Sequence, residues 1–472
     1  MKSSETGVQQ IFFAVFPGYR GHFHPDLPTP KRVMVALGRH DFFYSQLYSL
    51  SVSRPGNPID YNSLKEVCRM RCELSMVLIL LTVFQACSLT NSDDDLAGHN
   101  NEPPLTEENG SCADLLMGAD LSYLNQVLDY GGTFRDAGEV RDPWQLFADY
   151  GTDIVRLRKW HNPVWTAELY GDGEEKMYNG LKDVEEGIRR SKENDMDVLL
   201  DFHYSDLWAD PGRQEIPAAW LEINDLEVLS DSIYNYTYKT LEYLNSRGLM
   251  PEMVQIGNET NCGLLYSNAP SGFPKLNGCD GHWDNLAVVF NSAIRAVRDV
   301  AAHSETEPQI ALHVAQPENV VWWFDHMISA GTTDFDIAGF SYYSAWSDEP
   351  IENIGDQIAE FRSRYSRDVL ILETAYPWTL EDGDGYGNIF DAGSLINGYP
   401  ATSDGQKRYM EDLANEVKRG DGQGIIYWEP AWITSNLKHL WGEGSSWDNN
   451  TFFDHEGNTL PVFETMTCTA ES

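Results

Sequence analysis

Two glutamates, Glu259 and Glu373, stand where short apolar runs of the sequence end, the first closing residues 253–259 and the second residues 369–373. A carboxyl group at the carboxyl end of a buried strand lies where a β/α barrel keeps its reacting groups. Two such groups are what cleavage of a glycosidic bond requires: one protonates the leaving oxygen, and the other acts at the anomeric carbon. The pair therefore predicts glycosidase chemistry. For a single glutamate, a buried salt bridge to Arg156 or Arg158 is an equally good interpretation.

Short apolar runs recur along the chain and are separated by stretches with helical periodicity, such as 180–194 and 284–302. We expect strands at 115–119, 153–158, 197–203, 253–258, 309–314, 337–342, 369–373 and 424–428. Eight strands with intervening helices predict a single catalytic domain of the α/β class, a (β/α)8 or TIM barrel. An open doubly wound sheet would need a glycine-rich phosphate loop after the first strand, and residues 118–121 supply none.

Polar side chains near most of these strand ends support a common cleft. They are Arg156, Arg158, His203, Asn258, His313, Tyr342 and Trp428, together with the two glutamates. One such residue carries little information, because a lone polar residue at a strand end is usually a satisfied part of the core. Their recurrence predicts that they converge at one end of the barrel.

The first part of the chain reads as a leader. Met70-Arg71-Cys72 precedes an apolar run of residues 74–84, too short to span a bilayer, and then Ala86-Cys87. This pattern resembles a bacterial lipoprotein signal peptide at 70–87, with Cys87 lipidated and an acidic tract beyond it, as in Bacteroidetes lipoproteins. Residues 1–69 then form an untranslated or disordered leader, with a small N-terminal domain as the alternative. Residues 88–110 form a flexible acidic tether to the catalytic domain at 111–472.

Composition restricts the partners. The formal net charge of −40 disfavours nucleic acid and anionic membrane surfaces, so we expect membrane contact only through the lipid anchor. We also expect a monomer. Of seven cysteines, Cys112, Cys262, Cys279 and Cys468 lie beyond the leader, and four cysteines allow three pairings. A local bridge between Cys262 and Cys279 is favoured, which would leave Cys112 and Cys468 to join the two ends of the domain.

Several runs of the sequence are similar to glycoside hydrolase family 53 of clan A, the endo-β-1,4-galactanases. The matching runs are Gly118-Ala119-Asp120, Val155-Arg156-Leu157-Arg158 with Trp160, the run 200–206 with Trp208-Ala209-Asp210-Pro211-Gly212, the run 253–259, and Glu373-Thr374-Ala375-Tyr376-Pro377. The resemblance covers residues 115–463. It implies a retaining mechanism, with Glu259 as acid/base and Glu373 as nucleophile on strands four and seven.

The expected substrate contacts are Asn258, Arg156, His203, Tyr342, Trp428, Asp120 and Trp208. Asn258 would bond the sugar hydroxyl beside the anomeric carbon, and Trp428 would form the floor under that sugar. Arg156 and a hydroxyl such as that of Tyr342 would keep Glu373 ionised. His203 would orient sugar or carboxylate, with a purely structural histidine as an equal alternative.

Oxygen-bearing residues alternate with glycine in the loop after the second glutamate. Asp382, Asp384, Tyr386 (through its carbonyl) and Asn388 have a spacing that can wrap Ca²⁺. The resemblance implies that Ser445 and Asp448 complete the site. A metal-free acidic turn is the alternative.

Together these features predict an exported, lipid-anchored, calcium-containing enzyme of the bacterial outer membrane, which hydrolyses β-1,4-galactan and galacto-oligosaccharides with retention. The alternatives are another clan A endo-β-glycanase, acting on mannan or a glucan, and a surface glycan-binding lipoprotein without catalysis.

Overall fold

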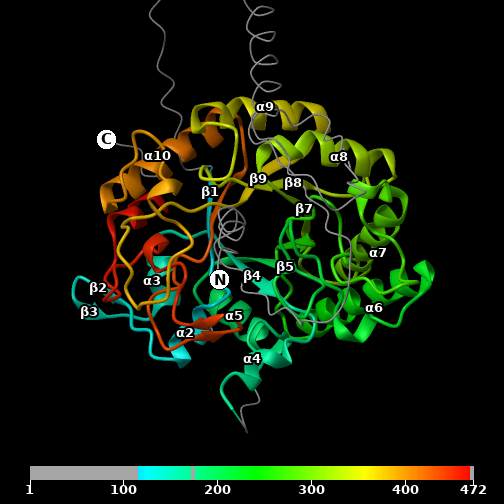
Figure 1. The fold of residues 1–472 in the computed structure, drawn as a ribbon, viewed down its shortest axis with the longest axis horizontal. Helices are drawn as coiled ribbons and strands as arrows, with labels where there is room; N and C mark the ends of the chain where they lie inside the picture. Colours follow the sequence, from blue (N-terminus) through cyan, green and yellow to red (C-terminus); the bar gives the residue numbers. More distant parts are fainter. Residues whose placement is uncertain (1–114, 172–175, 468–472) are drawn as a thin grey trace, which may run out of the picture. The chain divides into compact units, whose positions relative to one another are not determined.

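The computed structural model describes residues 115–171 and 176–467. Eight parallel strands close into a barrel in which each strand pairs with its neighbours and β1 pairs with both β4 and β10 (Figure 1). The barrel strands, in chain order, are β1 (Leu116–Asp120), β4 (Ile154–Lys159), β5 (Asp197–Phe202), β6 (Met253–Ile256), β7 (Gln309–Ala315), β8 (Ile337–Ser341), β9 (Asp368–Glu373) and β10 (Gly424–Tyr427). All eight predicted strands are thereby confirmed to within a few residues at each end.

Helices follow the barrel strands and lie around them (Figure 1). They are α2 (Leu124–Asp129), α3 (Pro143–Asp149), α4 (Val164–Glu168), α5 (Leu181–Glu193), α6 (Leu226–Asn245), α7 (Trp283–Ala301), α8 (Val320–Ser329), α9 (Ile354–Tyr365) and α10 (Ser403–Arg419). The helices predicted at 180–194 and 284–302 correspond to α5 and α7. Two small hairpins decorate the loops, β2 (Arg135–Asp136) with β3 (Glu139–Val140) and β11 (Lys438–His439) with β12 (Gly442–Glu443).

Local sequence explains where several helices begin. The side chains of Asp142, Asp225 and Thr402 accept hydrogen bonds from backbone N–H groups at the starts of α3, α6 and α10. Such caps satisfy donors that have no partner inside the helix. Among the described residues, no helix is long and apolar enough to cross a membrane.

Two apolar clusters hold the fold together. The larger one lies between the strands and the helices. The smaller one takes residues from seven strands and consists of Ile154, Leu199, Met253, Ala311, Ile337, Leu370, Leu372 and Ile426. Because these side chains come from strands all around the ring and contact one another, they fill the inside of the barrel. We call this set the lower layer.

Candidate active site

Polar side chains lie directly above the lower layer. Side chains alternate across a strand, so a residue two positions further along points to the same face. In β4, β5, β6 and β7, the residues two positions after Ile154, Leu199, Met253 and Ala311 are Arg156, Asp201, Gln255 and His313, and all four are buried. We call these four residues, together with the polar groups that they bond, the upper layer. The barrel interior thus changes from apolar to polar within two residues along these strands.

Arg156 is the centre of the upper layer. Its Nη1 lies 2.8 Å from Asp120 Oδ2 and 2.8 Å from Glu373 Oε1, and its Nη2 lies 2.8 Å from Asp201 Oδ2. The side chain is 1% exposed, so all three ion pairs are buried. A guanidinium can satisfy several oxygens at once in a fixed plane, which suits it to this position. The expected contact between Arg156 and Glu373 is therefore present.

Glu373 ends β9 and is almost fully buried. Strict alternation after Leu370 and Leu372 would turn its side chain out of the barrel. The pairing of β8 with β9 is irregular at this point, since Phe340 pairs with Ile371 but Ser341 pairs with Glu373. Such an irregularity re-aims a side chain. It brings the Glu373 carboxylate to Arg156 and to the hydroxyl of Tyr343, which donates to Oε2 at 2.9 Å.

The prediction that the Tyr342 hydroxyl assists Glu373 is wrong by one residue. Ser341 faces the interior, so Tyr342 faces outward into the core and donates its hydroxyl to the carbonyl of Glu349. Tyr343 faces the interior again and makes the contact that was expected of Tyr342.

Glu259 follows β6 with a φ of 45°, in the left-handed region that a glutamate rarely adopts. Strain of this kind persists where the surroundings fix it, and it is common at functional sites. Ser341 donates its hydroxyl to Oε1 of Glu259 at 2.7 Å. The residue as a whole is 9% exposed.

The two glutamates differ in their affinity for a proton. Burial raises the pKa of the Glu259 carboxyl well above its usual range, and the nearby charge of Glu373 raises it further. Burial also raises the pKa of Glu373, to about 7, but Arg156 and the Tyr343 hydroxyl oppose that rise. As pH rises, Glu373 is therefore the first of the two to ionise, and Glu259 keeps its proton to higher pH.

Asn258 is held in one orientation beside Glu259. Its Oδ1 accepts from Arg156 Nη2 at 2.7 Å and lies 3.2 Å from Gln255 Nε2. Its Nδ2 donates to the carbonyl of Ala209 at 2.9 Å. An amide group has two hydrogens on nitrogen, so the second remains for another acceptor.

Two residues predicted to touch substrate lie instead beneath the site. Asp120 is fully buried, and it accepts from Arg156 and from Ser122. His203 is 2% exposed, with Nε2 lying 3.0 Å from Asp201 Oδ2 and Nδ1 accepting from the backbone of Ala209. Their polar atoms are already engaged with the protein, so both position Arg156 or its partners. Of the two interpretations of His203, orientation of a carboxylate is the one that the contacts match.

Trp208 and Trp428 lie side by side at the mouth, with ring centroids 5.7 Å apart, and both are half-buried. The guanidinium of Arg158 lies 3.9 Å from the Trp208 ring centroid, and its Nη2 bonds Glu429 Oε1 at 3.1 Å. Glu429 lies two residues after the end of β10, directly after Trp428, and is fully buried. We did not predict a role for it, although it carries the same strand-end signal as Glu259 and Glu373.

The predicted bridge between Cys262 and Cys279 is present, with Cα atoms 5.0 Å apart. It closes a loop that follows Glu259. Cys87, Cys112 and Cys468 lie outside the described residues.

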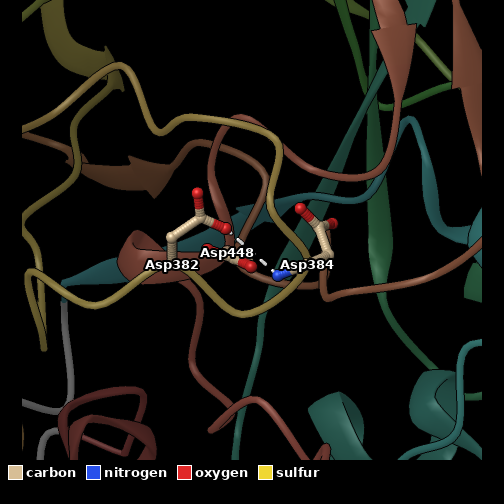
Figure 2. Close-up of side chains that lie close together, drawn as sticks. All are labelled: Asp382, Asp384 and Asp448. Atoms are coloured by element: carbon tan, nitrogen blue, oxygen red, sulfur yellow. Dashed lines mark hydrogen bonds between the residues drawn. The ribbon is translucent and has the colours of Figure 1, made fainter.

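Three of the predicted metal ligands come together in the loops after β9 and β10. Oxygens of Asp382, Asp384 and Asp448 lie within 4.8 Å of one another (Figure 2). Asn388 joins them by donating from Nδ2 to Asp448 Oδ1 at 2.8 Å. Ser445 donates its backbone N–H to Asp384 Oδ2 at 2.7 Å, and its hydroxyl bonds the carbonyl of Trp432. The ring of Tyr386 packs edge-on against His439.

A buried oxygen in this cluster has no hydrogen-bond partner among the described residues: Oδ1 of Asn388. Unsatisfied buried oxygens are rare in folded proteins. A hard cation that takes six to eight oxygen ligands fits a site with one unpartnered amide oxygen and three carboxylates.

A closed (β/α)8 barrel with two buried carboxyl groups at the ends of its fourth and seventh strands defines a glycoside hydrolase architecture. The family model for glycosyl hydrolase family 53 matches residues 116–466, and the chain belongs to this family. An arabinogalactan endo-β-1,4-galactanase from Cellvibrio japonicus is 43% identical over 351 residues, which cover 74% of this chain and 89% of that protein. An endo-β-1,4-galactanase from Bacillus subtilis is 29% identical, over 84% of this chain and 97% of that protein.

Solved structures agree with the family assignment. The family 53 catalytic domain from Ignisphaera aggregans has a TM-score of 0.67 at 31% identity, over 75% of this chain and 96% of that domain. A fungal β-1,4-galactanase has a TM-score of 0.61 at 27% identity, over 75% of this chain and 99% of the other.

Proposed function

We propose that the protein is a retaining endo-β-1,4-galactanase that cleaves galactan and galacto-oligosaccharides. The observation that carries this proposal is the pair Glu259 and Glu373, whose surroundings separate their proton affinities. The two similar proteins from Cellvibrio japonicus and Bacillus subtilis are both named as endo-β-1,4-galactanases.

In the first step, Glu373 attacks the anomeric carbon while Glu259 protonates the leaving oxygen, and the glycosidic C–O bond breaks. In the second step, Glu259 takes a proton from water, the water oxygen attacks the anomeric carbon, and the bond to Glu373 breaks. Two inversions restore the original configuration. Arg156 and Tyr343 stabilise Glu373 as a carboxylate before the attack and again when it leaves.

Sugar recognition is assigned to groups that remain accessible. The second Nδ2 hydrogen of Asn258 is available to the hydroxyl beside the anomeric carbon, a contact that strengthens in the transition state. The half-buried rings of Trp428 and Trp208 provide apolar faces for sugar rings.

The reaction can be tested with galactan, mannan, xylan and glucan, by measuring new reducing ends and following the anomer by proton NMR during early turnover. We expect β-anomeric product from galactan. Release from mannan or glucan alone would assign the protein to another clan A activity. Binding of galactan with no turnover by the wild type would identify a binding protein instead.

We also propose that Ca²⁺ is bound by Asp382, Asp384, Asn388 and Asp448, with the Tyr386 carbonyl and Ser445 completing the shell. The ion would crosslink the loops after β9 and β10. The unpartnered Asn388 Oδ1 and the three neighbouring carboxylates support this.

Chelation with EDTA should lower the melting temperature, and Ca²⁺ should restore it. Asp448→Asn should abolish both effects, because Asp448 is the buried member of the cluster. An unchanged melting curve, with no metal found by elemental analysis, would favour the metal-free acidic turn.

Export and anchoring remain proposals: a signal peptide at 70–87, lipidation at Cys87, and a monomeric enzyme at the surface of the outer membrane. The sequence pattern at Ala86-Cys87 supports the anchor. Cys87→Ala should move the protein from the membrane fraction to the soluble fraction. Light scattering of the released enzyme should give the mass of one chain.

A further inference from the structure

A buried chain of hydrogen bonds runs away from Glu259 into the barrel. Ser341 Oγ lies 2.7 Å from Glu259 Oε1, and His313 Nε2 lies 2.9 Å from Ser341 Oγ. Ser341 and His313 have no exposed surface. A hydroxyl has one hydrogen, so Ser341 can donate to the glutamate or to the histidine but not to both. The proton position on His313 therefore decides what Glu259 receives.

The opposite nitrogen of His313 indicates which tautomer is present. The backbone N–H of Glu259 points at His313 Nδ1 from 3.3 Å, and Gln255 Nε2 lies 3.0 Å from the same atom. If Nδ1 carried the proton, this buried N–H would face another N–H and lose its acceptor, which costs about 1–3 kcal/mol. Asn258 Oδ1 also lies 2.9 Å from Nδ1, but its two lone pairs accept from Arg156 Nη2 at 2.7 Å and from Gln255 Nε2 at 3.2 Å. Nδ1 is therefore the acceptor, and Nε2 carries the proton.

Burial makes His313 neutral as well. It lowers the pKa of the imidazole well below its usual range, and the charges of Arg156 and His203 lower it further. A neutral imidazole has a single N–H, here at Nε2. Nε2 then donates to Ser341 Oγ, and the hydroxyl hydrogen of Ser341 must point to Glu259 Oε1.

We propose that Ser341 and His313 are positioning residues that keep Oε1 of Glu259 an acceptor, so that its catalytic proton resides on Oε2. This inference rests on the assignment of Glu259 as the acid/base. A carboxylic acid that accepts on one oxygen carries its proton on the other. Oε2 then donates to the leaving oxygen in the first step and takes the proton of water in the second. The chain needs no change of tautomer between the steps, because Ser341 donates to Oε1 in both.

Other charged groups also act on Glu259. Glu373 and Asp210 raise its pKa, and Arg156 and the Ser341 hydrogen bond lower it. Removal of the Ser341 hydroxyl should therefore raise the pKa of Glu259, while the other charges stay in place. Because the acid form of Glu259 is required, the basic limb of the pH–rate profile should shift to higher pH. The limbs belong to the coupled pair of glutamates, so the shift is measured against the wild type.

The first test is Ser341→Ala, assayed on galactan across pH. We expect the apparent pKa of the basic limb of kcat/KM to increase by about half to one pH unit. We also expect kcat to fall about tenfold. Ser341→Thr, which keeps the hydroxyl, should restore the profile. The matched control is Ser292→Ala, which removes a buried hydroxyl paired with Ser230 between α6 and α7. It should leave the profile unchanged. An unshifted basic limb in Ser341→Ala would overturn the proposal.

The second test reads the tautomer directly in the wild-type enzyme. With ¹⁵N-labelled histidine, long-range NMR correlations distinguish protonated from unprotonated ring nitrogens, and loss of one signal set in His313→Gln assigns the residue. We expect a neutral ring protonated at Nε2. A ring protonated at Nδ1, or a charged ring, would contradict the proposal whether or not Ser341→Ala folds.

Glu259→Ala separates this inference from the assignment on which it depends. If Glu259 is the acid/base, this variant should still cleave a dinitrophenyl β-galactobioside and form a β-glycosyl azide when azide is added. If that holds and Ser341→Ala has an unchanged profile, only the positioning role fails. If Glu259→Ala loses activated and natural substrates alike and azide has no effect, the acid/base assignment itself fails.

Discussion

The lower and upper layers of the barrel interior are built by the same strands at positions two residues apart, yet their chemistry is opposite. The lower layer contains only apolar side chains, among them Leu370, Leu372 and Ile426. The upper layer contains Arg156 with three carboxylates, all buried. Apolar burial stabilises the fold without further conditions, whereas each buried charge is tolerated only through its partners. Changes in the lower layer should therefore affect stability, and changes in the upper layer should affect chemistry and its dependence on pH.

The largest effect is expected from Glu373→Gln. The amide keeps the shape of the side chain but is not a nucleophile, so kcat on galactan should fall by about 10⁴-fold or more. The melting temperature should change little, because Arg156 retains Asp120 and Asp201. A variant that lost turnover only because it unfolded would contradict the separation of the two layers.

Arg156→Leu should lower the stability of the fold and also change the pH dependence of catalysis. It leaves three buried carboxyl groups without their cation, which destabilises the fold by about 3–5 kcal/mol. The pKa of Glu373 should rise, so the acidic limb of the pH–rate profile should shift to higher pH. The control is Arg364→Leu, which breaks a solvent-exposed ion pair with Asp325 and should cost far less stability, because water screens exposed pairs. The free energy of unfolding of both variants is measured by chemical denaturation. Equal losses would show that burial of the Arg156 network does not determine its contribution to stability.

Ile426→Ala tests the lower layer. The cavity that it creates should destabilise the protein by about 2–5 kcal/mol. The value of kcat should stay within about twofold of the wild type at a temperature where both are folded, because Ile426 contacts apolar residues. A large fall in kcat with a native melting temperature would show that the lower layer also tunes the site.

Glu429→Gln should change how the stability of the protein depends on pH, between about pH 5 and pH 8. Burial raises the pKa of Glu429 to about 8, and the charge of Asp120 adds to this while Arg158 opposes it. The folded state thus keeps a proton that the unfolded chain releases near pH 4.5, so this group's stabilising contribution is full below that pH and is lost as pH rises to 8.

The variant lacks this proton, so its free energy of unfolding should fall less between pH 5 and pH 8. The difference in slope from the wild type should approach about 1.4 kcal/mol per pH unit. Urea denaturation at several pH values measures it. Parallel curves for the two proteins would mean that Glu429 is ionised when folded.

Much of the site could be predicted because strand ends are legible in a sequence. Glu259 and Glu373 close apolar runs, and the ends of parallel strands meet at one face of a barrel. Glu429 carries the same signal directly after Trp428 and was missed. Asp201 and Gln255 interrupt apolar strands at inward positions, so they too were open to prediction.

Two errors arose from geometry that a sequence does not display. Tyr342 was chosen over Tyr343 because the sequence does not show which of two successive residues at a strand end faces the barrel interior. Asp120 was expected to touch sugar, but its position at a strand end does not reveal that Arg156 covers it. Both depend on which face of the strand a residue occupies.

By itself, the sequence determined the eight-stranded barrel, the two glutamates, the local disulfide and the acidic loop, because each is written in short-range pattern or spacing. The tertiary structure decided which polar groups meet. The β8–β9 irregularity turns Glu373 inward, and closure of the ring brings Arg156 to carboxylates from three different strands. Ser341 and His313 reach Glu259 only across neighbouring strands. Contacts between residues far apart in the chain follow from register and closure, and no local pattern specifies these.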